Sequence, residues 1–191
     1  MNKINILAEG YAKIFPDGWM ANPNVVLVTS SNGIKIIVDP GCNRQLLLQK
    51  LSQANINPEE IDFVFLTHNH MDHSMNTALF PKAKVIDHEA IYDGDKAELV
   101  KDTIPGTDVK ILQTPGHQLD HSSLTISTEE GIVVIAGDVF WFEDNEEPSL
   151  DVEKKDPYAA DFKALKESRK KLIALADWII PGHGAKIKNT R

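Results

Sequence analysis

A run of metal-binding side chains follows directly on a short apolar segment in the first half of the chain. The apolar segment, Asp62–Thr67, predicts a buried strand, and the run, His68–His73, reads His-Asn-His-Met-Asp-His. In an extended chain alternate side chains point the same way, so the first two histidines of the run can both reach one cation. The aspartate and the last histidine lie past a turn and can face a second cation beside the first. Imidazole nitrogen and carboxylate oxygen are ligands that suit zinc, iron or manganese.

Three more side chains of the same kind follow later predicted strands. His117 ends a Thr-Pro-Gly-His segment, Asp138 follows a glycine, and His183 lies in a Pro-Gly-His-Gly segment. In layered α/β folds, reactive residues collect at strand ends, where rigid elements hold the loops in place. We therefore expect these residues to join the first run. The small residues around His183 allow its loop to approach closely.

The remaining pattern predicts a single layered α/β domain over residues 1–191. Expected strands are 24–29 paired with 34–39, then 62–67, 84–87, 109–113, 123–127 paired with 132–136, and 178–180. Expected helices are 44–54, 74–79 and 160–176. The first hairpin turn contains Asn32-Gly33, residues that accept positive φ angles. Hairpins together with crossovers favour mixed sheets over a purely parallel one.

Composition excludes several classes of protein. A chain of 191 residues can bury a substantial core, and its net charge of −8 disfavours nucleic acid as a partner, because phosphate contacts need clustered Lys and Arg. No apolar segment is long enough to cross a membrane, and the N-terminus has no signal-peptide pattern, so we expect a cytoplasmic location. The single cysteine, Cys42, excludes an intramolecular disulfide and a Cys-rich zinc site. Any metal must be held by His and Asp.

In combination and in this order, the motifs resemble those of the metallo-β-lactamase superfamily. The resemblance covers the chain from about Val25 to His183. It implies an α/β fold, a four-layered αββα sandwich with the metal site at one edge of the sheets. It also implies ligands for a first metal, His68, His70 and His117, ligands for a second, Asp72, His73 and His183, and a bridging ligand, Asp138.

The implied cofactors are two divalent metal ions, zinc in the first place, with iron or manganese as alternatives. Two neighbouring cations can share a water, lower its pKa towards neutrality and stabilise the oxyanion that forms on attack. Asp72, a terminal ligand with a second oxygen free, is the candidate catalytic residue that orients the hydroxide and takes up its proton. Asp39 lies in a segment similar to the family's early Asp-x-Gly turn. It either holds a metal ligand through a hydrogen bond or only shapes the turn.

Several other residues have two interpretations. His121 is interpreted as a structural histidine rather than a further ligand, and His88 as a solvated residue at a strand end. Cys42 is interpreted as a packing residue. The Phe140–Phe142 segment either forms a wall of the substrate pocket or packs in the core, and Trp19 and Tyr158 are weaker candidates for the wall.

The favoured function is metal-dependent hydrolysis of a small ester, thioester, lactone or phosphoester, with a small molecule as the partner. Asp138 weighs against antibiotic hydrolysis, because true β-lactamases of the superfamily lack that bridging aspartate. The chain looks most like the short, stand-alone members, similar to the metallo-β-lactamase domain-containing protein 1 group. One alternative is a phosphodiesterase or ribonuclease of the same fold, which the net negative charge of the chain disfavours. Another is an iron-dependent oxidoreductase similar to persulfide dioxygenases.

Overall fold

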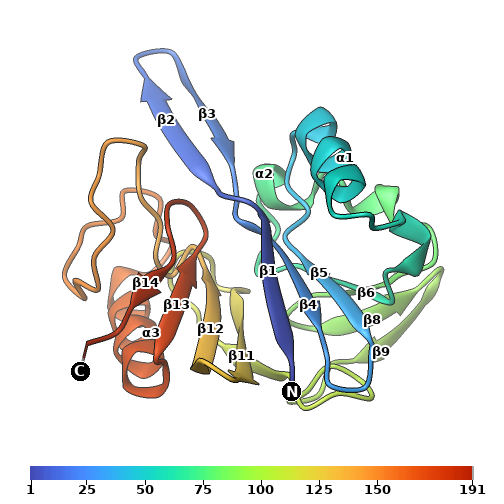
Figure 1. The fold of residues 1–191 in the computed structure, drawn as a ribbon. Helices are drawn as coiled ribbons and strands as arrows, with labels where there is room; N and C mark the ends of the chain where they lie inside the picture. The colour runs from blue at the N-terminus through green and yellow to red at the C-terminus, as the bar shows by residue number, and fades with distance from the viewer. Residues whose placement is uncertain (191) are drawn as a thin grey trace.

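Two β-sheets stack face to face in the computed structural model, which describes residues 1–190 (Figure 1). The first sheet has seven strands in the order β1-β4-β5-β6-β7-β8-β9. Their bounds are β1 Lys3–Ala8, β4 Val25–Thr29, β5 Lys35–Val38, β6 Phe63–Phe65, β7 Lys84–Ile86, β8 Ala90–Asp93 and β9 Lys96–Leu99. The second sheet has five strands in the order β10-β11-β12-β13-β14. Their bounds are β10 Lys110–Gln113, β11 Ser122–Thr128, β12 Gly131–Gly137, β13 Trp178–Pro181 and β14 Ile187–Lys188.

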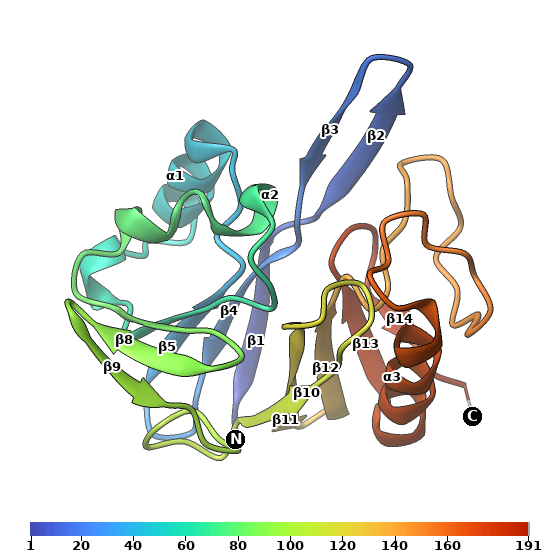
Figure 2. The ribbon, with the colours of Figure 1, turned by 180° about the vertical axis from the view of Figure 1, so that it is seen from behind.

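A separate hairpin of β2 (Tyr11–Phe15) and β3 (Gly18–Asn22) projects away from both sheets (Figures 1 and 2). The chain enters it from β1 and leaves it towards β4, so the base of the hairpin is fixed to the first sheet. Of its large apolar side chains, Trp19 is 73% exposed. The hairpin therefore owes little of its position to burial in the core.

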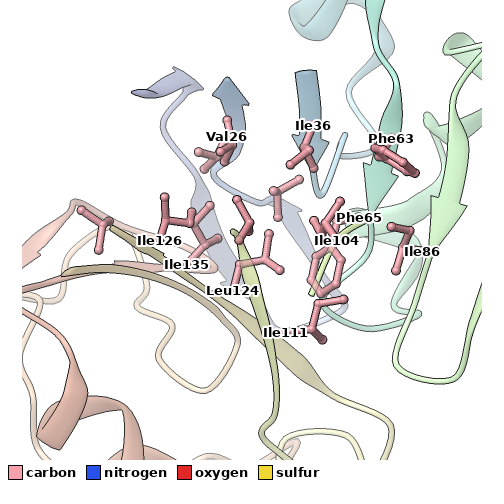
Figure 3. Close-up of a cluster of buried hydrophobic side chains, with 14 of the residues drawn as sticks. Val26, Ile36, Phe63, Phe65, Ile86, Ile104, Ile111, Leu124, Ile126 and Ile135 are labelled. Atoms are coloured by element: carbon pink, nitrogen blue, oxygen red, sulfur yellow. The ribbon is translucent and has the colours of Figure 1, made fainter. Parts of the chain in front are cut away.

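Apolar side chains from both sheets fill the space between them (Figure 3). Val26 and Ile36 point inwards from the first sheet and meet Leu124, Ile126 and Ile135 from the second. Side chains of a strand alternate between its two faces, so every second residue reaches this layer. The neighbours of these residues on the outer faces are also buried, since helices cover those faces.

One helix covers the outer face of each sheet. Helix α1 (Arg44–Gln53) places Leu47 and Leu51 against the first sheet, and helix α3 (Phe162–Leu175) packs Leu165 and Leu172 against the second. The layers are therefore helix, sheet, sheet and helix, which confirms the αββα architecture expected from the sequence. No helix among residues 1–190 is long and apolar enough to cross a membrane.

Parallel pairing brings the ends of several strands to one edge. Strands β5, β6 and β7 run parallel in the first sheet, as do β12 and β13 in the second. The carboxyl ends of parallel strands lie at the same edge, so the loops that follow β5, β6, β12 and β13 meet there. The predicted ligands His68–His73, Asp138 and His183 belong to the segments after β6, β12 and β13. His117 follows β10, which pairs antiparallel with β11 as β12 does and therefore ends at the same edge.

The local structure differs from the sequence prediction at one expected helix and at seven elements that the sequence did not predict. The expected helix 74–79 is instead a short helix α2 (Met71–Ser74) followed by the 3-10 turn η2 (Thr77–Leu79). It begins early because the carbonyl of His70 accepts the backbone N–H of His73. The strands β1, β2, β3, β8, β9 and β14 were not predicted as separate elements, and a further 3-10 turn, η1 (Pro58–Glu60), precedes β6.

Candidate metal centre

All seven side chains predicted as ligands converge at the edge where the parallel strands end. Two groups of donor atoms form, and within each group the atoms lie within 4.8 Å of one another. The members of the first group are His68, His70, His117 and Asp138, and those of the second are Asp72, His73 and His183. Helix α2 begins within the motif, so Asp72 and His73 project from a helical turn, whereas His68 and His70 precede it.

The carboxylate of Asp138 lies between the two groups. Its Oδ2 is 3.3 Å from His117 Nε2, in the first group. Its Oδ1 is 3.4 Å from His73 Nε2 and 3.7 Å from His183 Nε2, in the second. Each oxygen thus faces a different group, which is the arrangement that a bridging ligand requires.

Hydrogen bonds on the outer nitrogens fix two of the rings through carboxylates. His73 Nδ1 donates to Asp39 Oδ2 at 2.9 Å, and His117 Nδ1 donates to Asp156 Oδ2 at 2.7 Å. A ring that donates from Nδ1 presents the lone pair of Nε2 inwards, and such partners orient metal-ligating histidines. Asp39 therefore makes the contact expected of a residue that holds a ligand.

Two further rings are fixed by neutral oxygens. His183 Nδ1 donates to the carbonyls of Tyr11 and Asn22, both at 3.0 Å. The Thr67 hydroxyl donates to Asp39 Oδ2 at 2.7 Å, so the oxygen of Thr67 accepts from His68 Nδ1 at 3.0 Å. These rings also turn Nε2 towards the centre.

His70 is oriented the other way round. Its Nδ1 lies 3.0 Å from His68 Nε2 and 3.2 Å from His117 Nε2, while its Nε2 is 2.9 Å from the side-chain amide of Gln118. His68 and His117 each donate their ring proton from Nδ1 to a partner outside the centre. The lone pairs of His68 Nε2 and His117 Nε2 therefore converge on the same point as His70 Nδ1, and three nitrogens in this arrangement suit a cation.

Two buried polar atoms of the centre lack a hydrogen-bond partner within residues 1–190: His73 Nε2 and Asp138 Oδ1. Leaving such atoms unpaired in the interior is costly, and both belong to the proposed donor sets. The imidazole and carboxylate donors therefore fit divalent cations such as zinc, which would satisfy these atoms.

The pKa shifts in the protein without a metal also indicate that positive charge is favoured at this centre. Burial opposes protonation of His73, but the carboxylates of Asp138 and Asp39 outweigh it and raise the pKa of His73 well above its usual value. Burial would raise the pKa of Asp138, yet His73, His183 and His117 hold that pKa well below the usual value. For His68, burial and the neighbouring His73 lower the pKa well below normal, so this ring is neutral and can act as a ligand.

Two glycines allow close packing around the Asp138 carboxylate. A Cβ at residue 182 would lie 1.7 Å from Asp138 Oδ1, so only glycine fits there. Gly137 has φ +53°, and a Cβ at this position would come within 2.7 Å of His121 Nε2. The close approach expected for the loop around His183 is therefore present.

His121 supports the centre from outside both groups. Its Nε2 accepts the backbone N–H of Asp138 at 3.2 Å, and its Nδ1 lies 3.0 Å from Thr114 Oγ1. Burial lowers the pKa of His121 to about 3, which keeps the ring neutral. The structural interpretation of this histidine agrees with these contacts.

Relatives are known for almost the whole chain. The family model of the metallo-beta-lactamase superfamily matches residues 20–98. Metallo-beta-lactamase domain-containing protein 1 of Mus musculus is 32% identical over 93% of this chain and 74% of its own length. The chain belongs to the metallo-β-lactamase superfamily.

Solved structures of the superfamily share the fold. A metallo-beta-lactamase-type protein of Thermotoga maritima matches 98% of this chain and 99% of its own, with a TM-score of 0.75 and 24% identity. A dizinc quorum-quenching lactonase matches 87% of this chain and 74% of its own, with a TM-score of 0.64 and 20% identity. At these identities the likeness establishes the fold alone.

A cavity of about 380 Å³ opens onto the centre of this superfamily member. Five of the predicted ligands line it, as do Trp19 and Tyr158. Of the Phe140–Phe142 segment, Trp141 lines the cavity, whereas its two neighbours pack against α3 in the core. The segment therefore supplies one residue to the lining of the cavity and two to the core.

The remaining candidates lie outside the two groups. Cys42 is half-buried and its thiol donates to the carbonyl of Ala21, while burial and the nearby Asp72 raise the pKa of the thiol. His88 is half-buried, and its Nδ1 is a buried atom without a partner in the described part of the chain, so it is less solvated than expected.

Asp156 is the site residue that the sequence did not reveal. It is 8% exposed and lies in the acidic loop between β12 and α3, with no flanking strand or recognisable motif. Neither hydrophobic period nor spacing to other ligands identifies it. Only the folded loop brings it to His117.

Proposed function

We propose that this chain is a dinuclear metal-dependent hydrolase that acts on a small ester, thioester, lactone or phosphoester. The observation that carries the proposal is the position of Asp138, with one carboxylate oxygen facing each group of donors. A site for a single metal would not need a carboxylate between two sets of histidines. The fold shared with a dizinc lactonase supports two metals, and zinc is the proposed metal.

The chain would hold the first metal through His68, His70 and His117 and the second through Asp72, His73 and His183, with Asp138 shared. When bound, such a pair of cations supplies a water-derived nucleophile at neutral pH and stabilises negative charge on the attacked group. Every other part of the reaction falls to side chains of the protein.

Asp72 is the proposed proton acceptor. Its Oδ2 faces His183 Nε2 at 3.4 Å and His73 Nε2 at 3.7 Å, which leaves Oδ1 towards the cavity that the residue lines. Burial would raise the pKa of Asp72, but the hydrogen bond from His183 and the charge of His73 lower it. The carboxylate is therefore ionised at neutral pH and can take a proton at Oδ1 and pass it to the leaving group.

The test is elemental analysis of the purified protein, followed by assays with chromogenic esters, thioesters, lactones and phosphodiesters. We expect about two zinc ions per chain and hydrolysis of at least one of these classes. Asp138→Asn should lose metal and activity, and Asp72→Asn should lose activity. Asp95→Asn is the matched control, because Asp95 is exposed in the turn between β8 and β9.

Two results would overturn the proposal. Full activity of the Asp138→Asn protein would refute a shared carboxylate. Stoichiometric iron with thiol-dependent oxygen consumption, and no hydrolysis, would establish an oxidoreductase in its place.

A further inference from the structure

One face of hairpin β2–β3 forms a wall of the cavity. The register pairs Ala12 with Ala21 and Ile14 with Trp19. Alternate residues of a strand share a face, so these four side chains lie together, and all four line the cavity. Met20 and its partner Lys13 occupy the opposite face, and of these two only Lys13 also reaches the lining.

The size of the side chains on this face increases with distance from the metal centre. The base of the hairpin is fixed there, because the carbonyls of Tyr11 and Asn22 accept from His183 Nδ1. The alanine pair is next to the base, and Ile14 and Trp19 are nearer the tip. The alanines leave room beside the centre, whereas the larger pair presents a broad apolar surface further out.

A second apolar wall comes from the loop between β12 and α3, which runs beside the hairpin in both views (Figures 1 and 2). This loop contributes Trp141 and Tyr158, whose ring centroids are 5.8 Å apart, to the lining. Trp141 is anchored from behind, since Lys154 Nζ donates to its carbonyl and lies 5.0 Å from its ring centroid.

The lining offers no free positive side chain. Lys13 is the only Lys or Arg among the lining residues, and its ammonium is 3.0 Å from Asp144 Oδ2. The other charged groups of the lining are the carboxylates of Asp72 and Asp138. Asp72 and Asp138 are proposed metal ligands, so bound cations would offset their charge. Beyond the centre, the lining has no unpaired ammonium or guanidinium to pair with a phosphoester anion, whereas an uncharged ester needs no such partner.

The outer apolar surface is exposed and available for contact. Trp19 is 73% and Ile14 43% exposed, although both face a cavity. An apolar chain placed along this face removes that surface from water, which is favourable in proportion to the area covered.

We propose that the substrate is an uncharged carboxylic ester, thioester or lactone with an apolar acyl chain. The carbonyl lies beside Ala12 and Ala21, and the chain extends between Ile14–Trp19 and Trp141–Tyr158. This substrate class rests on the hydrolase function proposed above. In the reaction, the oxygen of one water bonds to the carbonyl carbon, the bond from that carbon to oxygen or sulfur breaks, and the leaving group takes a proton.

The first test is a series of p-nitrophenyl esters from acetate to octanoate, assayed with the zinc-loaded full chain beside bis(p-nitrophenyl) phosphate. We expect kcat/KM to rise about three- to fourfold per methylene until the wall is covered, and the phosphodiester to be the poorest substrate. Trp19→Ala should flatten this dependence on chain length. Met20→Ala, an exposed apolar residue on the other face of the same hairpin, should keep it.

A second test does not depend on turnover. Tryptophan fluorescence of the wild-type protein should respond to octanamide, an uncharged analogue with the same chain, at concentrations where acetamide has no effect. The response should weaken in Trp19→Ala and persist in Met20→Ala.

The outcomes separate the two proposals. If acetate or the phosphodiester is hydrolysed but chain length has no effect, or the phosphodiester is the best substrate, the substrate class is wrong and the hydrolase stands. If no compound is hydrolysed by zinc-loaded protein, the hydrolase function is refuted. Absence of octanamide binding would refute the apolar subsite in either case.

Discussion

Replacing Asp156 with alanine should weaken metal binding at the first group without removing a ligand. The Asp156 carboxylate accepts from His117 Nδ1 at 2.7 Å, and the side chain of Asp156 is fully buried. Without it, the Nδ1–H of His117 loses its acceptor in the interior and the ring loses its orientation. Loss of such a partner lowers metal affinity by about 10- to 100-fold, equivalent to about 1.4–2.7 kcal/mol.

The effect should be confined to one group, since only the first contains His117. Competition with a chromophoric chelator measures the two affinities separately. Asp156→Asn retains an oxygen that can accept from Nδ1, so it should lose less than Asp156→Ala. Asp151→Ala is the control, because Asp151 lies in the same loop but is exposed.

Two results would contradict this reasoning. Wild-type affinity at the first group of a folded Asp156→Ala protein would show that the carboxylate does not orient His117. An equal loss at both groups would show a general disturbance of the loop in place of a local one.

Three further substitutions follow from the same contacts. Gly182→Ala should reduce metal content at both groups, measured by elemental analysis, because its Cβ would displace Asp138; full occupancy would contradict the steric argument. His121 has a pKa of about 3, below the 6.5 of an unfolded chain, so the unfolded state binds the proton first as pH falls. Through this group, metal-free wild-type protein should therefore lose about 1.4 kcal/mol of its free energy of unfolding per pH unit below pH ~6.5. Urea unfolding at pH 7 and 5.5 should show a smaller loss for His121→Gln, and equal losses in the two proteins would refute the assignment. Arg169→Leu leaves the carbonyls of Val139, Val152 and Lys154 without their donor and should cost about 3 kcal/mol in urea unfolding; a loss below about 1 kcal/mol would refute this.

The sequence was most informative where chemistry and strand ends coincide. His68–His73, His117, Asp138 and His183 could be grouped because each follows a strand and because imidazole and carboxylate are rare in such a fixed order. Helix α3 was recognisable from the helical spacing of its apolar residues, and strand β4 from its continuous run of apolar, mostly β-branched residues. The structure brings these seven side chains together, and their role as ligands stays a prediction.

The sequence was least informative where tertiary contacts determine the structure. Strand β3 reads Gly-Trp-Met-Ala-Asn and shows no alternation of apolar and polar residues. Strand β9 reads Lys-Ala-Glu-Leu, which alternates over only four residues and is exposed throughout. Both are edge or hairpin strands in which every residue except Asn22 is exposed or half-buried, so burial does not impose the usual pattern. The contact between Asp156 and His117 spans 39 residues and depends on the loop between β12 and α3.

The metal centre and the walls of the cavity are held by the same residues. The hairpin wall is attached to the second group, because the carbonyls of Tyr11 and Asn22 accept from His183 Nδ1. The loop wall is attached to the first group, because Asp156 accepts from His117 through one oxygen and from the backbone N–H of Tyr158, at 2.9 Å, through the other. Each wall thus orients a histidine of a different group, so a displacement of either wall would also turn a ring that faces the centre. The surface that lines the cavity can therefore vary at positions such as Ile14 and Trp19, whose side chains take no part in these hydrogen bonds, while the backbone that carries them has to stay in place.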